Sequence, residues 1–412
     1  MLQNLIKGLK ITYNKTVTSI AFIPAFIAIA FLLFSVLMIT FDFSSTGKSI
    51  KSNLSWLSLQ DASTARSIIS AIAAGVISLT VFSFSMVMIL LNQAASQMSN
   101  RVLDKLIGNR FQQIVLGFYI GTIVYALFLL STIRDIDSGI YIPAISTYVL
   151  IAFTIVDIFL FIYFLHYITQ TVKYETIIHK IHDNTIASIK TNCLLDHKPE
   201  MLIHEMKGYE IKSFKSGLYQ GFDRKELIKL CVKEHAVVSF LFPVGTYVIE
   251  NIPLLYVSSK NSPDKKFHKQ LSQIINIHRE QDIDVNYYYG FKHLMEVAIK
   301  ALSPGINDPG TAAISLQALA NLIAFKMRHF PEIHLKDKDG IIRVIIVEKT
   351  FEEVIEEFVL PIWDYGKNDR LIQREMVNVL KQLIVFGEQP SVRSLLERVQ
   401  HAIDQQKIET FI

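Results

Sequence analysis

One carboxylate stands alone in a long apolar stretch of the sequence. Asp157 lies within IPAISTYVLIAFTIVDIFLFIYFL, residues 142–165, and no other side chain of that stretch is charged at neutral pH. A charge is costly inside a bilayer, so Asp157 indicates a role such as an ion gate or a coupling site. The alternative is a protonated carboxyl that hydrogen-bonds a neighbouring helix. Helical depth, at about 1.5 Å per residue, gives Ser83, Ser85 and Tyr119 as its nearest polar partners.

A stripe of small and hydroxylated side chains runs along a second apolar stretch, residues 68–92. Its positions recur at a spacing that places them on one helix face. Small residues let helix backbones approach closely, so the stripe fits a packing face. Hydroxyls that face water around an oligomer axis would instead line a pore. The candidate pore-lining residues are Ser67, Ala71, Ala74, Ser78, Ser85 and Asn92.

The stretch ALSPGINDPGTAA, residues 301–313, places turn-forming residues between two apolar, helix-like segments. Asp308 is suited to cap the second helix, and Pro309 fits its first turn because no N–H is needed there. A helix N-terminus could also bind an anion, although the Asp308 carboxylate would itself occupy the positive end. The loop motif consists of Ser303, Pro304, Gly305, Asn307, Asp308 and Pro309.

Other chemistry-bearing residues form no recognisable constellation. His179 and His182 lie one helical turn apart, a spacing that metal sites use, but no third ligand follows them. Cys193 and Cys231 form no CxxC pair. The chain contains neither a nucleophile elbow nor a phosphate-cradling GxxxxGK[ST] loop. We therefore expect no enzyme, no bound metal and no cofactor.

Four apolar stretches of the sequence position Asp157 and the small-residue stripe. Each has about the 20 residues that a helix needs to cross about 30 Å of hydrocarbon, in a chain that is 51% hydrophobic. They predict a four-helix all-α transmembrane domain in a lipid bilayer. The stretches are 18–40, 68–92, 114–133 and 142–165.

Basic residues near the ends of these stretches predict the orientation. Segments 1–17 and 93–113 each carry three Lys or Arg, whereas 134–141 carries only Arg134. Segment 41–67 also carries three, Lys48, Lys51 and Arg66, so it does not discriminate between the two orientations. Because basic loops stay inside, 134–141 is expected outside and both termini in the cytoplasm. Residues 169–412 balance their acidic and basic side chains, so nothing favours a nucleic-acid partner.

The second half of the sequence predicts an α+β cytoplasmic domain. Residues 166–190 contain no Gly or Pro and predict a stalk helix that continues the fourth span. Three β-like runs follow Asp223 and a short helix, helices are expected at 266–278, 288–302 and 309–330, and IIRVIIVE is typical of a strand. The predicted division is a cytoplasmic N-terminal segment 1–17, a transmembrane domain 18–168, a stalk helix and linker 169–208, a small β-rich unit 209–258 and a mainly helical domain 259–412.

The loop motif resembles the signature of a bacterial family, the predicted membrane proteins called domain of unknown function 2254. LSPGINDPGTA carries the likeness, with Gly310 at a position where the family commonly has an aromatic residue. Phe82-Ser-Phe-Ser85 and the polar run Asn92–Gln97 resemble the second span of that family, and the likeness extends over nearly the whole chain. It implies a multi-pass protein of the bacterial inner (plasma) membrane and no established activity.

Two classes of function remain. The leading hypothesis is an oligomeric channel or transporter-like assembly, a homo-oligomer in which the second span lines the path, Asp157 gates or couples it, and a cytoplasmic domain regulates it. The alternative is a non-conducting membrane-anchored sensor or scaffold whose cytoplasmic domain binds a ligand or a protein. The sequence does not identify the ion or small-molecule ligand in either case.

Overall fold

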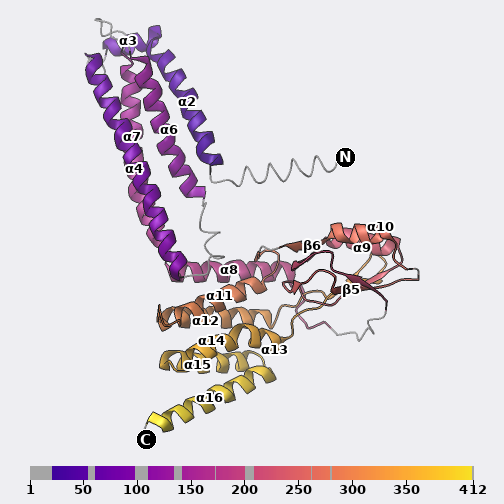
Figure 1. Cartoon of the computed structure of the whole chain (residues 1–412). Coiled ribbons are helices and arrows are strands. Elements are labelled where there is room, and N and C mark those ends of the chain that lie inside the picture. Colours follow the sequence, from indigo (N-terminus) through magenta and orange to yellow (C-terminus); the bar gives the residue numbers. More distant parts are fainter. Residues whose placement is uncertain are drawn as a thin grey trace. The chain divides into compact units, whose positions relative to one another are not determined.

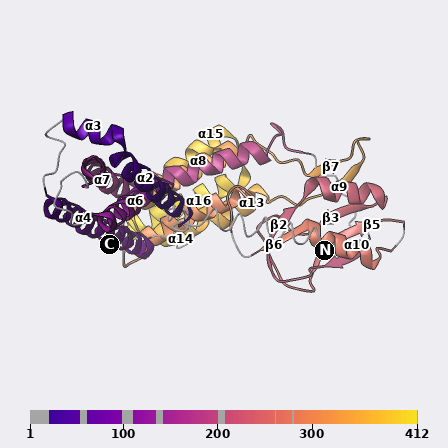
Figure 2. The same ribbon diagram turned by 90° about the horizontal axis from the view of Figure 1, so that it is seen from above.

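A computed structural model describes residues 21–53, 61–97, 110–133, 142–171, 173–199, 208–260, 262–278 and 281–410. The chain divides into two compact units, which can be followed in Figures 1 and 2. The membrane unit comprises the residues up to Ser96 together with Val102–Lys173. The α/β unit comprises Tyr174–Ile412 and the short segment Gln97–Arg101.

Four long apolar helices confirm the prediction of four membrane spans. They are α2 (Phe22–Asp42), α4 (Ala62–Gln97), α6 (Arg110–Thr132) and α7 (Ala144–Thr171), and a short α3 (Ser45–Asn53) follows α2. Helices satisfy their own backbone groups, so these elements are suited to contact with lipid. Segments 1–17 and 134–141, on which the predicted orientation depends, lie outside the described residues.

Two glycines of α6 bring α2 into close contact. A Cβ atom at Gly117 would lie 2.6 Å from Cδ1 of Ile27, and one at Gly121 would lie 2.7 Å from Cγ of Phe31. Any larger residue would push the two helices apart, which explains the small-residue spacing. These two glycines form a GxxxG pattern in the third span, and the pattern serves packing inside one chain.

Helices of the α/β unit lie in successive layers, as Figure 1 shows. Helix α8 packs on α11 and α12, α12 packs on α15, and α15 packs on α16. The helices are α8 (Tyr174–Asn192), α9 (Arg224–Lys233), α10 (Lys265–Ile274), α11 (Tyr288–Ala301), α12 (Pro309–Lys326), α13 (Phe351–Val354), the π-helical turn η3 (Ile355–Val359), α14 (Leu360–Gly366), α15 (Arg370–Phe386) and α16 (Pro390–Thr410).

Two sheets stand beside these layers together with α9 and α10 (Figure 2). A five-stranded sheet has the order β1-β5-β3-β8-β7, and a three-stranded sheet has the order β4-β2-β6. All pairings are antiparallel except that of β3 with β8. The strands are β1 (Tyr209–Lys212), β2 (Gly217–Phe222), β3 (Val237–Phe240), β4 (Tyr247–Val248), β5 (Pro253–Ser258), β6 (Ile275–His278), β7 (His334–Lys336) and β8 (Ile342–Ile345). This mixed region confirms the expected α+β class.

The structure differs from the predicted stalk helix. Helix α7 ends at Thr171 and a separate α8 begins at Tyr174. Six side chains of α8 are buried inside the α/β unit, because its apolar face packs on α11 and α12 rather than standing in solvent. The buried residues are Ile177, Ile178, Ile181, Thr185, Ser188 and Ile189.

The predicted boundary at residue 258 does not separate two bodies. Strand β6 pairs with β2, and β8 pairs with β3, so segments beyond 258 complete both sheets. Residues 275–278 form β6 instead of the end of a helix, since Ile275 and Ile277 alternate with exposed residues as a strand requires.

Candidate functional site

Asp157 lies in a buried polar cluster between three spans. Its side chain neighbours Thr122 of α6, and Tyr119, one turn earlier on α6, neighbours both Asp157 and Ser83 of α4. All four residues are at most 3% exposed. Their hydroxyl and carboxyl oxygens are shielded from solvent, and none makes a hydrogen bond of good geometry to a described residue. Buried polar groups of this kind are costly in a bilayer, so the cluster is a candidate functional site.

Two of the three partners expected for Asp157 are therefore neighbours in this cluster. Ser85, the third, is exposed on the opposite side of α4. The sequence analysis did not identify Thr122, because a depth estimate gives the level of a residue in the membrane but not the helix face on which the residue lies. Its spacing of three residues from Tyr119, which places both on one helix face, is the signal that would have found it.

The candidate pore-lining stripe faces away from its own helix bundle. Its residues are exposed, whereas Ala65, Ile69, Ala73 and Val76 form the buried face of α4. The hydroxyls of Ser67 and Ser78 are already bonded to carbonyl oxygens of their own helix, each at 2.9 Å. The exposed stripe residues are Ser67, Ala71, Ala74, Ser78, Ser85 and Asn92.

A second buried carboxylate, Asp42, lies at the C-terminal end of α2. Asp42 is 0% exposed and pairs with Lys51 of α3, with 2.8 Å between Oδ1 and Nζ. Its Oδ2 accepts from both the backbone N–H and the hydroxyl of Ser146 in α7, each at 2.8 Å. Tyr125 of α6 then donates to the carbonyl oxygen of Ser146 at 3.1 Å. This network ties four helices together, and its complete set of partners indicates a structural role.

The loop motif forms the predicted helix cap. Oδ1 of Asp308 accepts from the backbone N–H of Thr311 at 3.1 Å, and Oδ2 accepts from its hydroxyl at 2.6 Å. Pro309 is the first residue of α12. Asn307 adopts a positive φ of 48°, which the short Asn side chain tolerates.

The remaining motif residues shape the turn before this cap. The Ser303 hydroxyl donates to the carbonyl oxygen of Lys300 at 2.6 Å, while Pro304 and Gly305 are exposed. Asp308 also lies near Tyr174, at the start of α8, where burial and then the Asp308 charge raise the pKa of the tyrosine. The Asp308 charge thus acts on the first helix after the membrane unit.

A buried network that the sequence did not reveal lies at the end of α12. The hydroxyls of Tyr287 and Tyr288 both donate to Oε1 of Glu348, the second at 2.7 Å. Lys326 approaches the same oxygen at 3.4 Å and lies 5.5 Å from the ring centre of Tyr287. Burial, and then the charge of Glu348, raise the pKa of Tyr288 well above its ordinary value, so this hydroxyl stays protonated. These residues are spread over 61 positions of sequence, so no local motif predicts the network.

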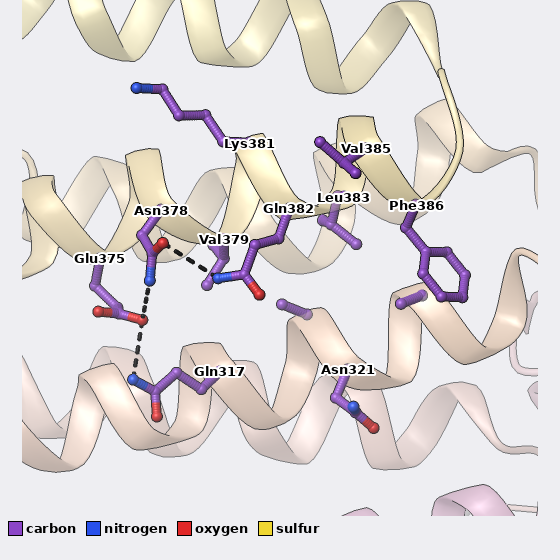
Figure 3. Close-up of a pocket in the computed structure, with 12 residues that line it drawn as sticks. Gln317, Asn321, Glu375, Asn378, Val379, Lys381, Gln382, Leu383, Val385 and Phe386 are labelled. Carbon is purple, nitrogen blue, oxygen red and sulfur yellow. Dashed lines mark hydrogen bonds between the residues drawn. The ribbon is translucent and has the colours of Figure 1, made fainter.

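Two cavities of the α/β unit adjoin these helices. An open groove of about 710 Å³ is lined by residues of α12 and α15. Figure 3 shows its amide-rich walls, where Gln317 donates to Glu375 at 2.9 Å and Gln382 donates to Asn378 at 3.2 Å. The second cavity, of about 300 Å³, lies beside Lys326 and Glu348.

His182 of α8 makes side-chain contacts within the α/β unit. Nε2 of His182 lies 2.8 Å from Oδ1 of Asn321, and Nδ1 lies 3.0 Å from Asp183. His179 is exposed. Within the part of the chain that the structure describes, no three His, Cys, Asp or Glu side chains gather as metal ligands would.

The fold and these sites define a multi-pass membrane protein with a mixed α/β domain that follows four candidate spans. Residues 17–382 match the family described as predicted membrane protein (DUF2254), and the chain belongs to this family. This confirms the resemblance seen in the loop motif.

Curated relatives of the chain are uncharacterized proteins. It is 22% identical over 342 residues to the uncharacterized protein Rv1290c of Mycobacterium tuberculosis (strain ATCC 25618 / H37Rv) and to the uncharacterized protein Mb1321c of Mycobacterium bovis. Each match covers 80% of this chain and 65% of the relative, so the chain spans less than two thirds of the relatives' length. No solved structure matches the chain.

Proposed function

We propose that this protein forms a homo-oligomeric channel or transporter-like assembly in which copies meet along α4. The observation that carries the proposal is the outward direction of the small-residue stripe. Ala71, Ala74 and Ser78 are exposed beyond their own bundle, although small and hydroxylated faces in membranes are typical of helix contacts. Repetition of α4 around an axis would place Ser85 and Asn92 on a common path.

The polar cluster supplies this proposal with a titratable element. Ser83 belongs to the buried face of α4 and neighbours the cluster of Asp157, while the stripe occupies the other face. A change of protonation at Asp157 would therefore act on the same helix that lines the path. The proposed role involves no catalysis, and the termini are proposed to be cytoplasmic.

A non-conducting sensor is the second candidate, favoured by the cavity beside Lys326. A domain that binds a ligand can signal without any conduction. The two candidates share the architecture and differ in whether ions cross the membrane.

Conductance of the purified full-length protein in a planar bilayer separates them. We expect channel currents in a KCl gradient and at least a tenfold loss in Ala74→Trp, which fills the path or blocks assembly. Leu127→Trp is the matched control, because Leu127 is 51% exposed on α6 and away from the stripe. Absence of current at every voltage would leave the sensor as the function.

Cross-linking tests the assembly independently. Ser78→Cys should form disulfide-linked dimers under mild oxidation, while Ile158→Cys, 47% exposed on α7, should remain monomeric. The native Cys193 and Cys231 are buried and will not contribute. Equal cross-linking of both variants would contradict contact along α4.

A further inference from the structure

The cavity beside Lys326 combines apolar walls with basic side chains. It lies where α12 ends, between the segment 198–199 and the start of α13. Its volume, about 300 Å³, is at the lower end of the range that small-molecule sites occupy. The apolar walls come from Ile323, Met327, Phe330, Pro331, Ile333, Phe351 and Val354.

Lys326 carries a buried ammonium group with unused donors. Its side chain is 10% exposed, and its contact to Glu348, at 3.4 Å, is long for a charge-assisted hydrogen bond. The Phe330 and Tyr287 rings each lie 5.5 Å from its Nζ. An ammonium has three donors, and the approach to Glu348 can occupy only one of them. An acceptor inside the cavity would satisfy it.

The charges that face the cavity favour an anion. Lys198, Lys326 and Lys349 line it together with one acid, Glu348. The charge of Glu348 is balanced by Lys326, which lies 3.4 Å from its Oε1, and the same oxygen accepts hydrogen bonds from two tyrosines. Lys349 pairs with Glu357 at 2.5 Å, and Glu357 does not line the cavity. Three lysines and one carboxylate give the lining a net positive charge, which favours an anionic occupant.

We propose that this cavity is a binding site for a small amphiphilic anion, an apolar body that carries one carboxylate or phosphate. The anionic group would meet Lys326 and Lys198, and the apolar body would lie against Phe330, Ile323 and Val354. Binding is a property of the α/β unit alone. Only its use as a regulatory signal rests on the proposed channel function, so a failure of conductance would leave the site itself standing.

Fluorine NMR on the full-length protein in nanodiscs tests the site. The probe is 4-(trifluoromethyl)benzoate, whose size suits the cavity, and the matched neutral compound is 4-(trifluoromethyl)benzamide. We expect saturable broadening of the benzoate signal and at least tenfold weaker binding of the amide. Lys326→Met should weaken benzoate binding at least tenfold, since it keeps the length of the side chain and removes the charge.

Three further variants distinguish a specific loss of binding from unfolding of the protein. Lys198→Met changes an exposed side chain and should weaken binding severalfold with an unchanged melting temperature. Val354→Phe should fill the cavity and abolish binding. Lys338→Met, an exposed lysine of a loop away from the cavity, should bind as the wild type does. Equal affinity of wild type, Lys326→Met and Val354→Phe, or equal affinity for amide and benzoate, would overturn the proposal.

Nanodisc composition identifies the source of the anion. The titration is repeated in phosphatidylcholine alone and with phosphatidylglycerol added. Competition by phosphatidylglycerol would assign the site to an anionic lipid headgroup, and an unchanged affinity would assign it to a soluble anion. Both results support the site, whereas absence of saturable binding in either membrane would exclude it.

Discussion

Asp42 caps a helix that begins a hundred residues later in the chain. Its Oδ2 accepts from the backbone N–H and the hydroxyl of Ser146, both at 2.8 Å. Ser146 lies in the first turn of α7, where backbone N–H groups have no partner within the helix. The carboxylate therefore satisfies α7 while Lys51 neutralises it, and α2, α3 and α7 are held at one end of the bundle.

Removal of the Lys51 charge should destabilise the membrane unit strongly. Lys51→Met leaves a fully buried carboxylate without its cation, and breaking a buried pair in this way costs about 3–5 kcal/mol. Asp42→Asn should cost less, because the amide oxygen still accepts from Ser146. Thermal unfolding of the purified protein gives the order of the melting temperatures.

Lys48→Met is the control for Lys51, because Lys48 belongs to the same short helix and is exposed. Its melting temperature should equal that of the wild type. If Lys51→Met and Lys48→Met melt together, the ion pair contributes nothing to stability.

Gly290 should be intolerant of any side chain. A Cβ atom there would lie 1.8 Å from Oγ1 of Thr185, so α11 and α8 could not keep their contact. Overpacking of this kind costs about 1–3 kcal/mol, and Gly290→Ala should lower the melting temperature accordingly. Thr185→Gly in the same chain should recover part of the loss.

Gly305→Ala is the matched control, since no atom of a described residue lies within 4 Å of the position that a Cβ would occupy there. Although Gly305 belongs to the loop motif, this change should leave the stability within about 0.5 kcal/mol of that of the wild type. If Gly290→Ala does not change the melting temperature, α8 is not packed on α11, and the predicted stalk helix would again be the better description.

Local signals in the sequence predicted the parts of this fold that depend on neighbours along the chain. The four spans followed from uninterrupted apolar length, and the cap at Asp308 followed from residue type. The strands β3, β4 and β5 followed from short apolar runs between turns. Each of these features is determined within a few residues.

Features that depend on distant pairing could not be predicted. Strand β6 forms because it pairs with β2, more than 50 positions earlier, and a four-residue apolar run does not distinguish a strand from a helix end. The Asp42 network and the Tyr288–Glu348 contact likewise join residues 104 and 60 positions apart. Helix depth predicted the level of Asp157 in the membrane. It could not predict that Ser83 faces the bundle and Ser85 faces away, because those directions depend on how the helices pack.

Asp308 should stabilise α12 as a hydrogen-bond acceptor, and its negative charge should not be needed. Asp308→Asn should be nearly silent because Asn caps about as well, whereas Asp308→Ala should cost on the order of 1 kcal/mol. The loss should be somewhat larger here because the Thr311 hydroxyl also loses its partner. Chemical unfolding of the purified protein measures both variants. Asp364→Ala, at an exposed helical position, serves as the control, and loss of function in a fully stable Asp308→Asn would contradict the cap.

Orientation can be measured with introduced cysteines. Burial raises the pKa of the Cys193 thiol to about 11 and that of Cys231 to about 12. Because alkylation requires the thiolate, both native cysteines should stay unlabelled at pH 7.5, even in broken membranes. Ser49→Cys, exposed on α3, should be labelled by an impermeant maleimide from outside intact cells. Ser262→Cys, exposed in the α/β unit, should react only after the membrane is opened, and the reverse pattern would invert the topology.

Conduction should depend on pH through Asp157. This carboxyl is 1% exposed and neighbours Thr122, and no Lys or Arg of the described spans is among its neighbours, so its charge would have no cation to compensate it. If protonation acts on the path through α4, currents of the wild type should vary between pH 5 and 8, and those of Asp157→Asn should not. Thr122→Val keeps the shape of the side chain and removes its hydroxyl, so it should displace the midpoint of the pH profile and preserve the dependence itself. Ser85→Ala, on the exposed face of the same α4 helix, should leave the midpoint unchanged. Identical pH profiles in wild type and Asp157→Asn would contradict the coupling and reduce Asp157 to a packing residue between α6 and α7.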